Sequence, residues 1–185
     1  MIHDPVLTDR LSAFPRESFE GTAFRATGRS VDPLAPSTGG GRWAPPASDD
    51  GGFPILYASL VRDGAIAEVA SYLAMLTPLP RKPIMVHELV VSTQATLTLV
   101  RADLIDLGIE MSWYGERDYV KTQEIGAAIN FLGFDGLVAP SARWHCDNLM
   151  IFLENHGLSQ RLETVGAEEC DWVSWSETVG NPKGG

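Results

Sequence analysis

Glu68 is the first residue of this sequence that could do chemistry, because it is the only charged residue between Asp63 and Arg81. The surrounding segment 64–76 is predicted to be helical, and its residues are small or apolar on every side. Such a helix is largely buried, and carboxylates are rarely buried without a partner. Two interpretations stay open: a structural ion pair or exposed edge position, and a carboxylate on the wall of a functional cleft.

A second candidate is the stretch "GGRWAPP" at 40–46, in which a run of glycines leads into Arg42 and Trp43. Glycine lets the backbone approach a ligand closely, arginine binds anions, and tryptophan stacks on rings. The plainer alternative is a surface loop that covers itself with its own tryptophan. The stretch lies in a long irregular region, 28–54, and long loops in compact domains are usually functional or disordered. Because its flanks are predicted to be ordered, we favour a functional loop.

Arg25 and Ser141 are weaker candidates, taken from an apparent strand and from the end of another. Each has a plain alternative, since edge strands often carry charges and Ser is a common turn residue. No G-x-S-x-G surrounds Ser141, and no nucleotide-binding or zinc-protease motif occurs. His145 and Cys146 are adjacent and lack a second spaced pair, so we expect no metal site.

These residues must be positioned by a mixture of strands and helices. Apolar runs bounded by turn residues predict strands, and apolar residues at helical spacing predict helices. Strands are predicted at 22–27, 55–59, 84–91, 95–100, 136–140, 148–153 and 171–175, and helices at 64–76 and 121–132. The strands outnumber the helices and do not alternate with them, which favours an α+β fold over a doubly wound sheet.

Composition restricts the class of protein. The 185 residues, 44% of them hydrophobic, predict one domain over 1–185, with 181–185 as a flexible tail. A net charge of −10 without a basic tract argues against direct nucleic-acid binding. Two cysteines give no disulfide framework. Without a signal peptide or an apolar run of roughly 18 residues, we expect a cytoplasmic protein that does not enter membranes.

Taken in order, several segments together resemble the RES domain family. They are "FRATG", "GGRWAPP", "ILYAS", "AIAEVASYL", "TQEIGAAINFLGFDGLVAPSAR" and "NLMIF", which span residues 22–153. By matching position, the family's functional residues fall on Arg25, Arg42, Tyr57, Glu68 and Ser141. One departure is Ala44, which stands where the family usually has Asn after the Gly-Arg-Trp sequence.

This resemblance implies both a fold and an activity. The fold would be a single-domain, ADP-ribosyltransferase-like mixed sheet core with flanking helices and an NAD cleft. RES proteins are typically toxins of bacterial toxin–antitoxin pairs that consume NAD as a substrate. The partner implied is an antitoxin with a DNA-binding helix-turn-helix region, so any DNA contact would come through that partner.

The resemblance also assigns roles. Cleavage of the nicotinamide–ribose bond builds positive charge on the ribose, which Glu68 would stabilise as the catalytic carboxylate. Arg25 and Arg42 would bind the pyrophosphate or ribose. Tyr57 would offer its ring to the nicotinamide, and Ser141 would hydrogen-bond the nicotinamide amide or a ribose hydroxyl. Trp43 is expected to support the loop from the core.

Three functions remain open from the sequence. The favoured one is a toxin that transfers ADP-ribose from NAD to a protein acceptor. The first alternative is phosphorolysis or hydrolysis of NAD, which would deplete the cell of it. The second alternative is a nucleotide-binding module without enzymatic activity.

Overall fold

One long strand, β3 (Ile84–Thr98), organises the sheet of this protein. The computed structural model, which describes residues 3–179, shows a single continuous strand where the sequence predicted two, at 84–91 and 95–100. The strand continues through its polar middle because the Asp135 carboxylate accepts hydrogen bonds from the backbone N–H groups of Gln94 and Ala95, both at 2.8 Å. A neighbouring side chain therefore replaces the missing strand partner at this point.

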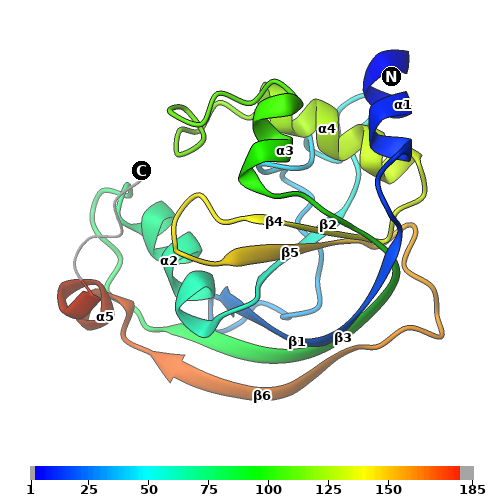
Figure 1. Ribbon diagram of the computed structural model, residues 1–185. Helices are drawn as coiled ribbons and strands as arrows, with labels where there is room; N and C mark the ends of the chain where they lie inside the picture. Colours follow the sequence, from blue (N-terminus) through cyan, green and yellow to red (C-terminus); the bar gives the residue numbers. More distant parts are fainter. Residues whose placement is uncertain (1–2, 180–185) are drawn as a thin grey trace.

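In the described part of the chain, five further strands join β3 in one sheet (Figure 1). They are β1 (Glu17–Thr27), β2 (Ile55–Ser59), β4 (Gly136–Pro140), β5 (Asp147–Phe152) and β6 (Leu162–Cys170). One side of β3 pairs with β1, and the other pairs first with β6 and then, in parallel, with β4. From β4 the pairing runs through β5 and β2 back to β1, so five strands form a closed ring and β6 extends it at an edge.

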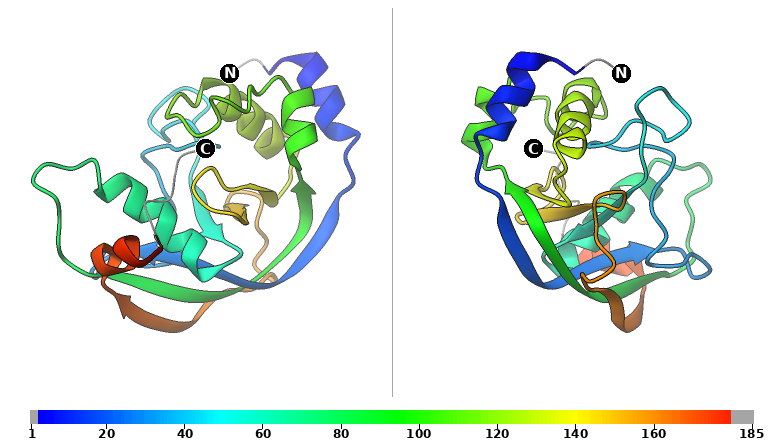
Figure 2. Two further views of the ribbon diagram at one scale, coloured as in Figure 1. Left: turned by 60° about the vertical axis from the view of Figure 1, so that its left-hand side comes forward. Right: turned by 90° about the vertical axis from the view of Figure 1, so that its right-hand side faces the viewer.

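The five helices found within residues 3–179 lie around this ring. They are α1 (Pro5–Ser12), α2 (Arg62–Leu73), α3 (Arg101–Asp106), α4 (Val120–Phe131) and α5 (Trp172–Val179). Helices α1, α3 and α4 cover the side formed by β2, β4 and β5, whereas α2 and α5 lie together at one end of β1 and β3 (Figures 1 and 2). The expected α+β architecture, with a sheet core and flanking helices, is confirmed.

Most predicted elements occur close to their expected bounds, but the predicted strand at 171–175 is wrong. Those residues begin helix α5. The Asp171 carboxylate accepts hydrogen bonds from the backbone N–H groups of Val173 and Ser174, which start the helix. Among the apolar residues that suggested a strand, Trp172 is buried in the core as part of this helix. Helices α1 and α3 and strand β6 were not predicted, and the expected tail at 181–185 lies outside the described residues.

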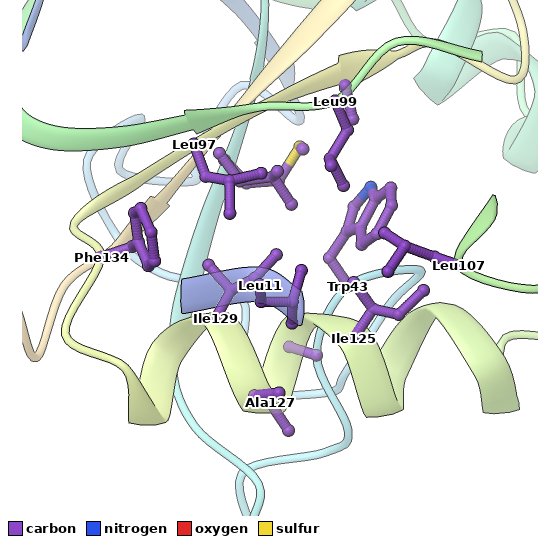
Figure 3. Close-up of a cluster of buried hydrophobic side chains, with 14 of the residues drawn as sticks. Leu11, Trp43, Leu97, Leu99, Leu107, Ile125, Ala127, Ile129 and Phe134 are labelled. Atoms are coloured by element: carbon purple, nitrogen blue, oxygen red, sulfur yellow. The ribbon is translucent and has the colours of Figure 1, made fainter. Parts of the chain in front are cut away.

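The main hydrophobic core lies between α4 and the strands β2, β4 and β5. Figure 3 shows Trp43 within this core, beside Leu99, Leu107 and Ile125. Only 2% of the Trp43 surface is exposed, so this residue supports its loop from the core as expected. A long loop without regular elements, 28–54, is thereby anchored to the body of the protein. Within residues 3–179, no helix has the length and apolar character needed to cross a membrane.

Candidate functional site

A cavity of about 470 Å³ opens between α2, the sheet and the loop 28–54. Its walls come from β1, β2, β5, α2, the loop and the segment that precedes α4. Four of the five residues singled out in the sequence line it, namely Arg25, Arg42, Tyr57 and Glu68. Segments distant in the sequence therefore bring these side chains to one place.

Glu68 projects from α2, and two side chains fix its carboxylate. The Ser141 hydroxyl and the Asn148 amide nitrogen both donate to Oε1, each at 2.8 Å. Among the described residues, no hydrogen bond to Oε2 is found. The structural ion pair considered for Glu68 is not found among the described residues, because both partners of the carboxylate are neutral. The carboxylate lies on the wall of the cavity, and its functional role stays a prediction.

Ser141 does not line the cavity but lies behind Glu68, where only 3% of its surface is exposed. Its hydroxyl oxygen accepts hydrogen bonds from the backbone N–H groups of Arg143 and Trp144 at 3.0 and 3.1 Å. With both N–H groups directed at the oxygen, the hydroxyl hydrogen is free to point at Glu68. The end of β4 thus positions Ser141 as a support for the carboxylate.

Arg25 reaches the cavity from β1 and is half-buried. One terminal nitrogen, Nη2, donates to the Ala35 carbonyl at 2.8 Å, and the other, Nη1, is buried with no partner among the described residues. Burial lowers the pKa of this arginine, and the charge of Asp32 partly opposes the effect. A buried guanidinium with an unpaired donor is prepared to bind an anion or another acceptor.

Arg42 enters the cavity from the loop and lies against two aromatic rings. Its guanidinium carbon is 4.6 Å from the ring centre of Tyr114 and 4.8 Å from that of Tyr119. Burial is the main cause of a lowered pKa, which the two tyrosines and Glu68 oppose. The contacts with the rings hold the plane of the guanidinium, so that its N–H groups keep one orientation.

The loop that carries Arg42 is fastened on both sides. The Trp43 backbone N–H donates to the Tyr57 hydroxyl at 3.0 Å, and the Gln123 amide donates to the Gly41 carbonyl at 2.9 Å. A Cβ at Gly41 would lie 2.7 Å from the Tyr57 hydroxyl oxygen, which explains why glycine occurs there. Burial raises the pKa of Tyr57, so the phenol stays neutral and serves as an acceptor for the loop.

The sequence analysis missed several residues of the site. They are Asn148, Tyr114, Tyr119, Gln123 and Arg117. Tyr114, Arg117 and Tyr119 lie in the irregular segment that precedes α4, whereas Gln123 lies in α4 and Asn148 in β5. The fold brings all five to the site. Among the described residues, no three His, Cys, Asp or Glu side chains are grouped as a metal site would require.

Comparisons with known proteins identify the family and the fold. The sequence model of the RES domain family matches residues 13–173. A chain in the crystal structure of the M. tuberculosis MbcT–MbcA toxin–antitoxin complex has the same fold, with a TM-score of 0.80. The sequences are 22% identical, and the match covers 94% of this chain and 97% of the other. No curated protein gives a significant sequence match.

Proposed function

This chain belongs to the RES domain family, and from that premise we propose that it is an enzyme that consumes NAD. It breaks the bond between nicotinamide and ribose and transfers the ADP-ribose to an acceptor. The observation that carries this proposal is the fixed Glu68 carboxylate, which shares one cavity with the arginines Arg25 and Arg42.

Glu68 acts in the bond-breaking step. The C–N bond breaks with its electron pair going to the nicotinamide, which leaves as a neutral molecule, and positive charge develops on the ribose. A carboxylate that is already oriented stabilises this charge without having to reorganise. An acceptor oxygen then forms the new bond to the same ribose carbon and gives up its proton, which Glu68 can accept.

The other residues bind and orient the NAD. Arg25, with its unpaired Nη1, and Arg42 provide charge for the pyrophosphate or ribose. Tyr57 contributes its ring to the cavity wall beside the nicotinamide, while its hydroxyl holds the loop. Ser141 supports Glu68 and does not contact substrate in this scheme, because its hydroxyl is buried and engaged.

The acceptor enters at the rim of the cavity, where Tyr72 and Arg117 are exposed. Because these two lining side chains are exposed, another protein can reach this side of the cavity, and we propose protein ADP-ribosylation as the first reaction to test. Phosphate and water are the alternative acceptors, and they need no change in the role of Glu68.

A mass-spectrometric assay tests the activity and identifies the acceptor. Purified protein is incubated with NAD alone, with NAD and phosphate, and with NAD and cell lysate. ADP-ribose on a lysate protein indicates transferase activity, ADP-ribose 1-phosphate indicates phosphorolysis, and free ADP-ribose indicates hydrolysis. If folded protein binds NAD but releases no nicotinamide in any mixture, the chain is a binding module and the proposal is wrong.

Glu68→Gln is the variant that tests the catalytic assignment. We expect nicotinamide release to fall by about 100-fold or more, because loss of one electrostatic group at a reacting centre costs about that factor. Glu20→Gln is the matched control, since Glu20 is exposed on β1 and does not line the cavity. Full activity in folded Glu68→Gln protein would contradict the role given to this carboxylate.

We further propose that the chain is the toxin of a toxin–antitoxin pair. The support is the family together with a fold shared with a chain of a solved toxin–antitoxin complex. The partner in this proposal is a small antitoxin with a DNA-binding helix-turn-helix region. A protein of that kind that co-purifies with the chain and stops nicotinamide release would be the antitoxin.

A further inference from the structure

Asn148 lies on the cavity wall, near the start of β5, and is one of the two side chains that donate to Glu68. We propose that Asn148 is a positioning residue that orients the Glu68 carboxylate for reaction. The inference rests on the proposed function, in which Glu68 is the catalytic group. Its basis is one contact, the 2.8 Å hydrogen bond from the Asn148 side-chain nitrogen to Oε1 of Glu68.

The chemistry of the two groups fixes the direction of this bond. An ionised carboxylate only accepts hydrogen bonds, and of the two ends of an amide only the nitrogen donates. Asn148 therefore turns its nitrogen to Glu68, and its oxygen, Oδ1, is buried with no partner among the described residues. A buried carbonyl without a hydrogen bond is a cost that a protein tolerates when the opposite end of the group is useful.

Two donors on the same oxygen give the carboxylate a defined orientation. Asn148 approaches Oε1 from β5, and Ser141 approaches it from the position directly after β4, the neighbouring strand of the closed ring. A carboxylate held at one oxygen by two charge-assisted bonds has little freedom to rotate. The other oxygen, Oε2, is then left for the positive charge of the reacting ribose.

Asn148 itself is rigidly placed. Its backbone is paired on one side with Ser59 of β2 and on the other with Ala139 of β4. Groups held by paired strands on both sides give a more defined geometry than groups on loops. Asn148 therefore combines a fixed backbone, a direct contact with Glu68 and a place on the cavity wall.

The first test is Asn148→Ala, measured as kcat and KM for nicotinamide release. A hydrogen bond to a charged group contributes enough to change a rate by about 10- to 100-fold. We expect kcat to fall by that factor and KM for NAD to change by less than about threefold, because the affected step is the reaction and not binding. Gln94→Ala is the control, since it removes an exposed amide from β3 outside the cavity.

The second test, Asn148→Asp, separates orientation from structural support. The aspartate side chain has nearly the shape of asparagine but places a second carboxylate beside Glu68, and two adjacent carboxylates tend to share one proton. When the introduced carboxyl group holds that proton, it can donate to Oε1 again. The activity of Asn148→Asp relative to wild type should therefore rise as the pH falls, whereas the same ratio for Asn148→Ala should not rise, because alanine has no group that can donate to Oε1.

Three results would overturn the proposal. The first is a wild-type kcat in folded Asn148→Ala protein. The second is a raised KM with kcat unchanged, which would make Asn148 a substrate-binding residue only. The third is an Asn148→Asp variant that stays at the same fraction of wild-type activity at every pH. If Asn148→Ala fails to fold, the isosteric Asn148→Asp still decides the question.

A nuclear magnetic resonance measurement keeps this proposal separate from the proposed function. If the wild type releases no nicotinamide, the proposed function fails, yet the contact can still be observed. The side-chain amide signals of Asn148, assigned by their absence in Asn148→Asp, should shift in Glu68→Ala and not in Glu20→Ala. Unchanged signals in Glu68→Ala would overturn the positioning role.

Discussion

At the residue scale, the charge of His87 depends on burial and on its neighbour Arg25. The two residues are paired across β1 and β3, and His87 is 8% exposed. One ring nitrogen, Nε2, lies 3.0 Å from the Thr27 hydroxyl, and the other, Nδ1, is buried without a partner among the described residues. Burial lowers the pKa of His87, the positive charge of Arg25 lowers it further, and Asp32 opposes both. A neutral His87 leaves Arg25 as the positive charge at this wall of the cavity.

This arrangement predicts a pH dependence of stability. The folded state takes up a proton on His87 less readily than the unfolded state, whose pKa is about 6.5. As the pH falls below about 6.5, the unfolded state binds a proton on His87 and the folded state does not, so the free energy of unfolding decreases. Between about pH 7.5 and 5.5, His87→Gln should lose less unfolding free energy than the wild type, as measured by urea denaturation.

The control for this prediction is His145→Gln, because His145 is exposed on the turn between β4 and β5. It should keep the wild-type dependence on pH. An equal loss of stability in the wild type and in His87→Gln would show that His87 is not held in its neutral form.

The sequence allowed some site residues to be found and concealed others. Glu68 could be identified because a lone charge in an apolar helix is conspicuous, and Arg42 because glycines precede it. Asn148 is the second residue of a largely buried strand and Gln123 lies in an apolar helix, where single amides are common. Their roles arise from strand pairing and from the packing of α4 on the loop, which one sequence does not reveal.

At the element scale, the position of α4 determines how closely the arginine loop is held. Gly126 lies in the middle of α4, and a Cβ there would overlap the backbone carbonyl oxygen of Trp43. Gln123, almost one turn earlier, donates to the carbonyls of Gly41 and Ala44 at 2.9 and 3.3 Å. The backbones of the helix and the loop are therefore in direct contact, and this contact holds the part of the loop that includes Arg42.

Gly126→Ala tests this contact by adding one methyl group. Alanine favours a helix over glycine by about 1 kcal/mol, so helix propensity alone predicts stabilisation. Overpacking against a backbone atom costs about 1–3 kcal/mol, and we expect this cost to exceed the gain, with a lower free energy of unfolding. Nicotinamide release should fall as well, because the loop must move to make room.

Gly39→Ala provides the control in the same loop, since a Cβ at Gly39 would meet nothing within 4 Å. It should leave both stability and activity near the wild-type values. A Gly126→Ala variant more stable than the wild type would show that the loop yields easily and that α4 does not fix it.

Helices and strands could be predicted where the apolar residues and helix or strand breakers within the segment itself determine its structure. The segments that became α2, α4 and β4 have clear apolar patterns and breakers, and they were found within a few residues of their bounds. The strand β6 is mostly exposed and has glutamates along it, so its pairing with β3 could not be anticipated from hydrophobicity. The predicted strand at 171–175 failed because the capping of α5 by Asp171 was overlooked.

At the scale of the whole molecule, the cavity links parts of the fold that are distant in sequence. The ring of strands provides Arg25 and Asn148, α2 provides Glu68, and the loop provides Arg42. The molecule has a net charge of −10, so the two arginines place positive charge inside an acidic protein. Their attraction for an anionic ligand must therefore act at short range, where water and salt screen it least.

Because the cavity exists only when these parts are assembled, binding of NAD should stabilise the whole fold. A ligand at 100 times its Kd stabilises the folded state by about 2.7 kcal/mol. For a chain of this size, such a gain raises Tm by about 5–10 °C. The measurement requires an inactive protein, and Glu68→Gln keeps NAD intact while retaining Arg25 and Arg42.

We expect NAD to raise the Tm of Glu68→Gln in proportion to the logarithm of its concentration. Adding Arg25→Ala should reduce the shift, because the unpaired Nη1 is the donor most ready for the ligand. Adding Arg81→Ala, which removes an exposed arginine outside the cavity, should leave the shift unchanged. A folded Glu68→Gln protein whose Tm does not respond to NAD would show that this cavity does not bind the dinucleotide. If the Tm shift is lost with Arg25→Ala and kept with Arg81→Ala, Arg25 on β1 provides the positive charge that binds NAD. If both substitutions reduce the shift equally, the effect comes from the net charge of the molecule and not from Arg25.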